Sequence, residues 1–202
     1  MSAPTASEDF ERCISRAGVV VFPADTVYGL ACDPEDADAV ERLYALKGRP
    51  PAKPAAVMFF DVGLALAAVP DVGPRTRAAL ERLLPGPVTV LVANPGGRFP
   101  LACGPAPTTL GIRVPVLEAL SGVRVPVLQS SANLAGGPDT SRLADVPEAI
   151  RAGADLVIDG GELPGTPSTV VDLRRYEASG QWGVARTGAV PYMELAEVLN
   201  VR

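Results

Sequence analysis

The chain has 202 residues, of which 48% are hydrophobic and 20% are charged, and its formal net charge is −5. The length suits a single domain, and the composition is that of a globular protein and excludes a disordered one. The acidic balance argues against a protein that coats nucleic acids, because such proteins carry a basic excess.

The chain contains three cysteines and no histidine. The cysteines form no CxxC pair, so neither a disulfide framework nor a zinc site is expected, and a reducing compartment is indicated. The lack of histidine excludes schemes in which a histidine activates serine or cysteine. No apolar run reaches the ~20 residues that cross a bilayer, and no signal peptide is apparent. We therefore expect a cytoplasmic protein with no membrane partner.

The predicted elements begin after residues 1–9, which are small and polar and are expected to form a flexible tail. Residues 18–22 are an apolar run that is typical of a buried strand. A helix is expected from Asp33, its N-cap, to Gly48, which suits the left-handed position that follows a helix. Lys47 lies in the last turn of this helix, where a cation complements the helix dipole.

The remaining elements alternate between strands and helices with short connections. Strands are expected over residues 55–60, 88–92, 110–114, 123–128, 156–158, 169–173 and 182–186, and helices over residues 75–84, 147–152 and 194–201. This alternation predicts an α/β fold with a twisted mixed sheet flanked by helices. We expect one domain, which extends from residue 10 to residue 202.

None of the common nucleotide-binding motifs occurs in the sequence. Without a Walker P-loop or a GxGxxG fingerprint, a nucleotide would have to be held in another way. Only Lys47 and Lys53 are lysines, and both lie in the proline-stiffened segment KGRPPAKP at residues 47–54. Such a segment is suited to holding a polyphosphate, and the alternative is a solvated loop.

Three other polar segments interrupt or end apolar strands, where ligands commonly bind. They are PADTVYGL at residues 23–30, QSSANL at residues 129–134, and residues 160–173, which begin with Gly160-Gly161 and end with GTPSTVVDL. Each has a plain structural alternative, a turn or capping loop whose side chains bond to the backbone. Arg113 and Arg186 each end a short apolar run and are candidates to point cations into the same cleft, although a lone arginine is more often a surface residue.

Taken together and in this order, these segments resemble the YrdC-like family of threonylcarbamoyl-AMP synthases, in its short, single-domain type. The matching stretches also include PGPVTVLV, TTLGIRVP and ARTGAVP, and together they span roughly residues 10–192. DTVYGL, KGRP, SAN and STVVDL are specific in combination. The resemblance implies a twisted mixed sheet with a concave, basic cleft.

The resemblance implies a nucleotidyltransferase, L-threonylcarbamoyladenylate synthase. Such an enzyme condenses L-threonine, bicarbonate and ATP to threonylcarbamoyl-AMP and pyrophosphate. Mg²⁺ would be bound together with the ATP. A downstream threonylcarbamoyl-transferase complex then uses the product to make N6-threonylcarbamoyladenosine in tRNA, and tRNA or another RNA is an additional candidate partner. Charge develops on phosphate oxygens in this reaction, so fixed cations are the main catalytic requirement.

The resemblance also implies roles for particular residues. Lys47 and Arg49 match a Lys-x-Arg pair and are expected to be exposed, to bind ATP and to be catalytic. Four further residues match positions on the nucleotide side: Thr109, Ser131, Asn133 and Arg186. Four match positions that line the threonine pocket: Thr26, Arg113, Gln129 and Ser168. Arg113 is expected to bind the threonine carboxylate through two nitrogens, and no resident metal site is expected.

The chain departs from the family pattern at Ala24, Ala55, Met58 and Asp139. These departures bear on the specificity for threonine more than on the use of a nucleotide. Three rival interpretations remain open: a non-catalytic RNA-binding YrdC-like module, a related carbamoyl-transfer enzyme of another pathway, and a degenerate family member, which only the departures above favour. Salt-dependent RNA binding without pyrophosphate release would favour the RNA-binding module.

Overall fold

The computed structural model describes residues 5–50 and 53–200, in which helices and strands alternate with short connections. The strands are β1 (Val20–Pro23), β2 (Tyr28–Cys32), β3 (Ala56–Met58), β4 (Val88–Ala93), β5 (Thr109–Arg113), β6 (Val127–Ser131), β7 (Leu156–Val157), β8 (Thr169–Asp172) and β9 (Gly183–Arg186). The α-helices are α1 (Ala6–Ile14), α2 (Ala37–Lys47), α3 (Val62–Ala68), α4 (Pro74–Leu83), α5 (Pro100–Cys103), α6 (Glu148–Gly153), α7 (Tyr176–Ser179) and α8 (Tyr192–Leu199). Two short 3-10 helices are η1 (Glu118–Leu120) and η2 (Leu143–Asp145).

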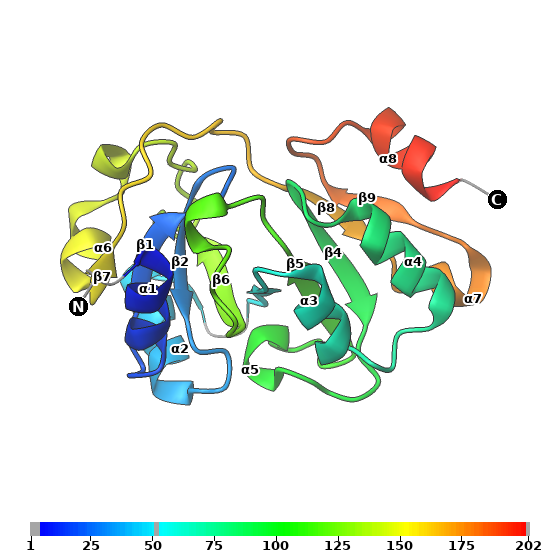
Figure 1. Cartoon of the computed structure of the whole chain (residues 1–202), viewed down its shortest axis with the longest axis horizontal. Helices are drawn as coiled ribbons and strands as arrows, with labels where there is room; N and C mark the ends of the chain where they lie inside the picture. The colour runs from blue at the N-terminus through cyan, green and yellow to red at the C-terminus, as the bar shows by residue number, and fades with distance from the viewer. Residues whose placement is uncertain (1–4, 51–52, 201–202) are drawn as a thin grey trace.

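Within the described residues the strands form one nine-stranded sheet in the order β7-β1-β2-β6-β3-β5-β4-β8-β9. The pairs β1/β7, β3/β5 and β4/β8 are parallel, and the other neighbours are antiparallel. Helices flank the sheet along its length, with α1, α2 and α6 beside the β7 end and α3, α4 and α8 beside the β9 end (Figure 1). The predicted α/β fold with a mixed sheet is confirmed.

Strand β1 is apolar on both faces because both of its faces are buried. In β1, Val21 belongs to the larger core, whereas Val20 and Phe22 belong to a smaller core with Phe10 and Ile14 of α1. The rings of Phe10 and Phe22 meet edge to face with their centroids 5.4 Å apart. This alternation follows from the two-residue period of a strand. A continuous apolar run is therefore the expected signature of such a strand.

The predicted flexible tail is wrong for its last residues, because α1 begins at Ala6. Thr5 and Glu8 form a capping box, in which the Glu8 N–H donates to the Thr5 hydroxyl and the Thr5 N–H donates to the Glu8 carboxylate at 2.8 Å. The box satisfies two N–H groups that have no partner within the helix. Phe10 and Ile14 then bury the apolar side of α1. Residues 1–4 lie outside the described residues.

The start of α2 also differs from the prediction, whereas its end agrees with it. Asp36, and not Asp33, is the N-cap, because its carboxylate accepts the Ala39 N–H at 2.9 Å. Asp33 instead closes a turn by accepting the Glu35 N–H at 2.8 Å. At the other end Gly48 has a φ of 57°, the left-handed conformation that glycine adopts readily.

Two strands bring polar residues to the middle of the sheet in a way that the prediction missed. The strand predicted at residues 123–128 lies at Val127–Ser131, because Pro126 has no N–H for the ladder and pairing begins after it. Gln129 is therefore inside β6 and not in a loop after it. The unpredicted strand β2 pairs with β1 as a hairpin whose turn is residues 24–27.

Candidate functional site

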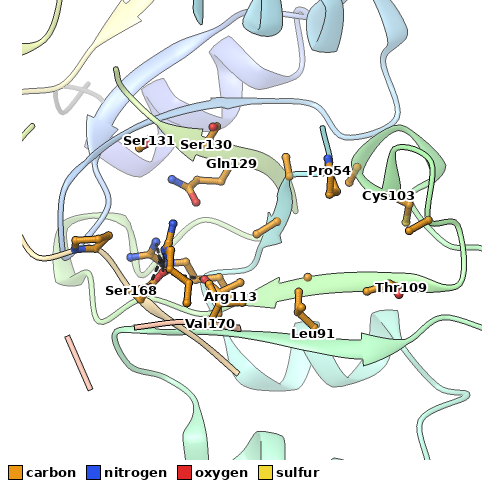
Figure 2. A pocket seen from close by; sticks show the side chains of 18 of the residues that line it. Pro54, Leu91, Cys103, Thr109, Arg113, Gln129, Ser130, Ser131, Ser168 and Val170 are labelled. Carbon is orange, nitrogen blue, oxygen red and sulfur yellow. Dashed lines mark hydrogen bonds between the residues drawn. The ribbon is translucent and has the colours of Figure 1, made fainter. Parts of the chain in front are cut away.

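A cavity of about 410 Å³ opens over the middle of the sheet (Figure 2). The charged residues that line it are four arginines and one aspartate: Arg49, Arg113, Arg174, Arg186 and Asp139. A second hollow of about 550 Å³ adjoins it and shares Thr109 and Arg174 with it. Hollows of this size match known small-molecule sites, and two that adjoin offer places for two ligands side by side.

Five adjacent strands, β6, β3, β5, β4 and β8, contribute residues to the floor of the cavity. Every second residue of a strand faces the same side, so Thr109, Gly111 and Arg113 of β5 all line it. Gly111 pairs in register with Ala56 of β3, which also lines it. These small residues leave space at the centre, and polar side chains surround that space.

Gln129 of β6 is 6% exposed and lines the cavity next to the β1–β2 hairpin. A Cβ atom at Gly29 would lie 2.9 Å from the Gln129 Nε2 atom and 3.2 Å from the Phe22 ring. A side chain at position 29 would therefore displace Gln129. This close approach explains why a glycine follows the polar residues of the segment at residues 23–30.

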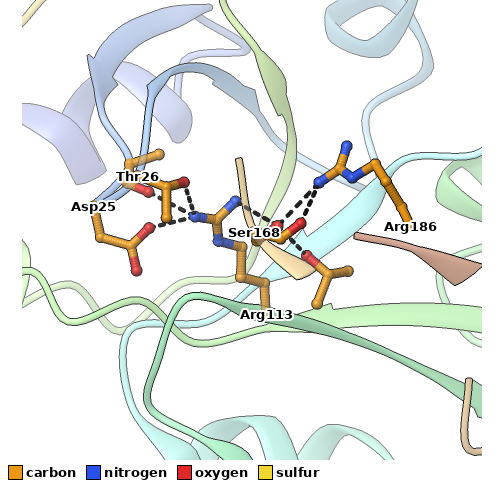
Figure 3. A network of polar contacts seen from close by, with 7 residues as sticks. Asp25, Thr26, Arg113, Ser168 and Arg186 are labelled. Carbon is orange, nitrogen blue, oxygen red and sulfur yellow. Dashed lines mark hydrogen bonds and ion pairs between the residues drawn. The ribbon is translucent and has the colours of Figure 1, made fainter. Parts of the chain in front are cut away.

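Arg113, at the end of β5, is held by the turn between β1 and β2 (Figure 3). Its Nη2 atom donates to the Ala24 carbonyl oxygen at 2.7 Å and to the Thr26 hydroxyl at 2.7 Å, and it forms an ion pair with Asp25. Burial raises the pKa of Asp25, and the charge of Arg113 opposes that rise. The Arg113 Nη1 atom lies 3.4 Å from the Ser168 hydroxyl, and among the described residues its Nε atom has no partner.

A second guanidinium group reaches the same place from the edge of the sheet. Arg186, at the end of β9, donates from Nη2 to the Ser168 carbonyl oxygen at 2.7 Å and lies 3.2 Å from its hydroxyl. Ser168 is fully buried, and its hydroxyl also lies 2.9 Å from the Thr89 hydroxyl. Burial lowers the pKa of Arg186, and the nearby charge of Arg113 adds to this effect, whereas Asp139 opposes it. Two guanidinium groups that converge on one serine favour an anionic ligand.

Lys47 is 2% exposed, so the expectation that it is exposed is wrong. Its ammonium group donates to the carbonyl oxygens of Ser131 and Asn133, the latter at 2.7 Å, and to the Asn133 side-chain oxygen at 3.0 Å. These three acceptors match the three donors of an ammonium group. The helix-terminal lysine is buried because the loop after β6 folds over it. Lys47 therefore holds this loop and does not line the cavity.

Arg49 is half-buried and does line the cavity. Its Nη1 atom donates to the Ser130 hydroxyl at 3.0 Å, and its Nη2 atom donates to the Pro54 carbonyl oxygen. The guanidinium carbon lies 5.6 Å from the centre of the Tyr44 ring, which supports a cation–π contact. Burial lowers the pKa of Arg49. Residues 51 and 52 of the same segment lie outside the described residues.

The structure brings most of the predicted site residues to one place. Those that line the cavity are Arg49, Thr109, Arg113, Gln129, Ser131, Ser168 and Arg186. Thr26, Lys47 and Asn133 lie behind these residues and hold them. Sequence reasoning gave no role to Asp25 and missed Thr89. Asp25 belongs to the polar segment at residues 23–30, which the sequence analysis identifies as a candidate. No sequence signal distinguishes Thr89 from any other threonine in a β-strand.

The structure describes residues 5–50 and 53–200. In that part of the chain no group of three or more His, Cys, Asp or Glu side chains is placed to hold a metal ion. No helix there has the length and apolar character needed to cross a membrane.

The burial of Lys47 has a direct spectroscopic test, because the chain contains only two lysines. Burial disfavours the charged ammonium group and lowers the pKa of Lys47 to about 8. In protein labelled with ¹³C in lysine, we expect the Lys47 Cε resonance to titrate with a midpoint near that value. The Lys53→Arg variant assigns the two resonances. A midpoint at the ordinary lysine value of 10.5 would contradict the buried position.

The chain is similar in sequence to a known protein family and to several known proteins. The Sua5/YciO/YrdC family, described as "Telomere recombination", matches residues 12–188. The threonylcarbamoyl-AMP synthase of Chromohalobacter salexigens is 35% identical over 175 residues, which cover 84% of this chain and 93% of that protein.

Two solved structures share the fold over nearly the whole chain. Pyrococcus abyssi Sua5 complexed with L-threonine has a TM-score of 0.82 at 28% identity, covering 94% of this chain and 56% of that chain. E. coli YciO has a TM-score of 0.74 at 25% identity, covering 93% of this chain and 91% of that chain. The present chain therefore spans little more than half of the Pyrococcus protein.

Proposed function

The chain belongs to the Sua5/YciO/YrdC family, and on that premise we propose that it is a threonylcarbamoyl-AMP synthase. The family that the sequence motifs predict is thus confirmed. The enzyme condenses L-threonine, bicarbonate and ATP to threonylcarbamoyl-AMP and pyrophosphate, which makes it a nucleotidyltransferase. The observation that carries this proposal is the convergence of Arg49, Arg113 and Arg186 on one cavity. The phosphates of ATP, bicarbonate and the threonine carboxylate are all anions, which such a cavity favours.

The amino-acid side of the cavity is proposed at the Arg113 end of β5. Arg113 binds the substrate carboxylate, Gln129 and Ser168 supply polar contacts, and Thr26 holds Arg113 from behind. These four residues come from β5, β6, the segment before β8 and the β1–β2 turn, and the observed hydrogen bonds join Thr26 and Ser168 to Arg113. A buried cation that is already fixed in place needs little reorganisation when a carboxylate binds.

The nucleotide side is proposed around Arg49, Thr109, Ser131 and Arg186, all of which line the cavity. The threonine amine and bicarbonate form a carbamate with loss of water. A carbamate oxygen then attacks the α-phosphate and forms a P–O bond, and the bond from the α-phosphorus to the bridging oxygen breaks, so that pyrophosphate leaves with its electrons. Arg49 and Arg186 stabilise the negative charge on the phosphate oxygens. Lys47 and Asn133 act through the loop that carries Ser131. No histidine base is required, because the carbamate already carries a nucleophilic oxygen.

Mg²⁺ enters this proposal as part of the Mg-ATP substrate. Mg²⁺ keeps several waters and is usually held by substrate phosphates with only one or two protein carboxylates. Asp139 is the carboxylate that lines the cavity, so the side chains there suit a metal that arrives with its nucleotide. A downstream threonylcarbamoyl-transferase complex acting on tRNA, and a location in the cytoplasm, complete the proposal.

The proposal is tested by pyrophosphate release from Mg-ATP with and without L-threonine and bicarbonate, with L-serine as the comparison. We expect release that requires both L-threonine and bicarbonate. Arg49→Met should lose it, whereas Arg98→Met, at an exposed arginine outside the cavity, should keep it. Release that is specific to another amino acid would retain the chemistry and change the substrate. No release from folded protein, together with salt-dependent RNA binding, would favour the binding module.

A further inference from the structure

The turn that holds Arg113 has an unusual backbone. The Thr26 N–H donates to the Ala24 carbonyl oxygen at 2.9 Å, and Asp25 between them has a φ of 63°. A bond across one residue of positive φ is the pattern of a rare and strained form of the γ-turn. Aspartate tolerates a positive φ better than most residues, yet such strain persists only where the surroundings impose it, and it clusters at functional sites.

This backbone lets three consecutive residues present an oxygen atom to a single nitrogen. The Ala24 carbonyl oxygen, the Asp25 carboxylate and the Thr26 hydroxyl all contact the Arg113 Nη2 atom (Figure 3). The side chains of Arg113 and Asp25 are 4% and 9% exposed. A buried pair of this kind is fixed far more firmly than an ion pair in water, because solvent screens it little.

The contacts at Nη2 limit what Arg113 offers to a ligand. A carboxylate that binds a guanidinium group through two parallel hydrogen bonds needs Nη2 together with either Nη1 or Nε, since Nη1 and Nε do not share an edge. Nη2 is already occupied. Nη1 is 3.4 Å from the Ser168 hydroxyl, at the far limit of a hydrogen bond, so its hydrogens are available to an oxygen in the cavity.

We propose that Asp25 is a positioning residue for the amino-acid subsite, which holds Nη2 of Arg113 so that Nη1 faces the substrate carboxylate. This inference rests on the proposed function and refines it. Arg113 binds the carboxylate through one nitrogen, in place of the two-nitrogen contact expected from the sequence. Asp25 touches no substrate, and its effect on binding passes through Arg113.

The test replaces the Asp25 side chain by a carboxylate from solution. Asp25→Gly keeps the positive φ without strain and opens space for formate. We expect the KM for L-threonine to rise about 10- to 100-fold with little change in kcat, because misplacing a binding group by about 1 Å has effects on this scale. Formate should lower the KM of the variant toward the wild-type value and should raise its Tm.

In the wild type, where Asp25 fills this place, formate should not lower the KM or raise the Tm. Asp33→Gly, the same exchange in a turn that does not line the cavity, should also show no response to formate. Asp25→Asn keeps an oxygen acceptor and tolerates the positive φ, so we expect an intermediate KM that formate does not improve. This variant carries the test if Asp25→Gly fails to fold.

The outcomes separate this inference from the proposed function. A wild-type KM in either Asp25 variant would overturn the positioning role. The positioning role would also be overturned if Asp25→Gly had a raised KM and formate changed neither its KM nor its Tm. That result would indicate that Asp25 acts only in the turn. A wild type without threonine-dependent turnover would instead overturn the proposed function, and the formate-dependent Tm of Asp25→Gly would still report whether Asp25 pairs with Arg113.

Discussion

Replacing Arg113 with methionine will abolish threonine-dependent turnover and will reduce the free energy of unfolding by about 3–5 kcal/mol, the usual cost of removing one partner of a buried ion pair. The methionine leaves the Asp25 carboxylate buried without a counter-charge, and it also removes the donor that the Ala24 carbonyl oxygen and the Thr26 hydroxyl share. For a chain of 202 residues this loss corresponds to a fall in Tm of about 6–20 °C. Thermal unfolding followed by circular dichroism measures it.

The loss of stability in Arg113→Met should depend on pH through Asp25. Burial raises the pKa of Asp25, and Arg113 opposes that rise, so the variant has a still higher pKa at this carboxyl group. Between the unfolded and folded pKa values the folded state binds more protons than the unfolded state, so stability falls as pH rises. We therefore expect a larger loss at about pH 8 than at about pH 5.

A double variant separates the stability effect from the catalytic effect. Asp25→Asn added to Arg113→Met removes the unpaired buried charge, so it should recover part of the lost stability and none of the turnover. Arg98→Met, at an exposed arginine, should leave both properties unchanged. An Arg113→Met protein that unfolds at the wild-type temperature would show that the buried ion pair is not formed.

Replacing Lys47 with methionine will reduce turnover by about 100-fold through displacement of the loop that it holds. Stability should also fall, because three hydrogen bonds from the ammonium group are lost. The lost hydrogen bonds are worth about 1.5–3 kcal/mol each, since the donor is charged. Removing the buried charge offsets part of this loss, because a pKa shift from 10.5 to about 8 corresponds to roughly 3 kcal/mol against the charged form.

Hydrogen exchange in the absence of ATP distinguishes this role from direct phosphate binding. In Lys47→Met we expect faster exchange at residues 131–137, because the ammonium group that contacts Ser131 and Asn133 is lost. Arg49→Met removes a cation that lines the cavity. This variant should lose turnover without faster exchange at residues 131–137. Unaltered exchange in an inactive Lys47→Met protein would instead favour phosphate binding by Lys47.

The sheet could be predicted largely from the sequence, because most of its strands contain buried apolar residues and appear in the sequence as apolar runs. Strand β2 is not predicted because it begins with Tyr28, directly after the polar residues of the turn that joins it to β1. Its other partner, β6, lies far along the chain. Helix α1 was missed because its first turn is polar. Its capping box, Thr5 to Glu8, was the local signal that could have revealed it.

The chemistry of the site was more predictable than the depth at which each residue lies. Arg113 and Arg186 each end a short apolar run. A cation at the end of a buried strand can line a cleft, so both residues could be predicted as site residues. The burial of Lys47 could not be inferred from a position at the end of a helix, because its acceptor Asn133 lies 86 residues away in sequence. The contacts of Arg113 with the β1–β2 turn span 87 to 89 residues and are equally invisible to local pattern.

The parallel pairing of β8 with β4 also has a consequence for the nascent chain. Ser168 lies directly before β8 and Arg186 ends β9, so these cavity residues are synthesised after β3, β4, β5 and β6, which form most of the cavity floor. Until β8 emerges from the ribosome, one edge of β4 has no partner strand, and an open edge is a template for pairing with other chains. Non-local pairing of this kind also forms slowly. We therefore expect chaperones that shield strand edges to raise the yield of this protein during its synthesis.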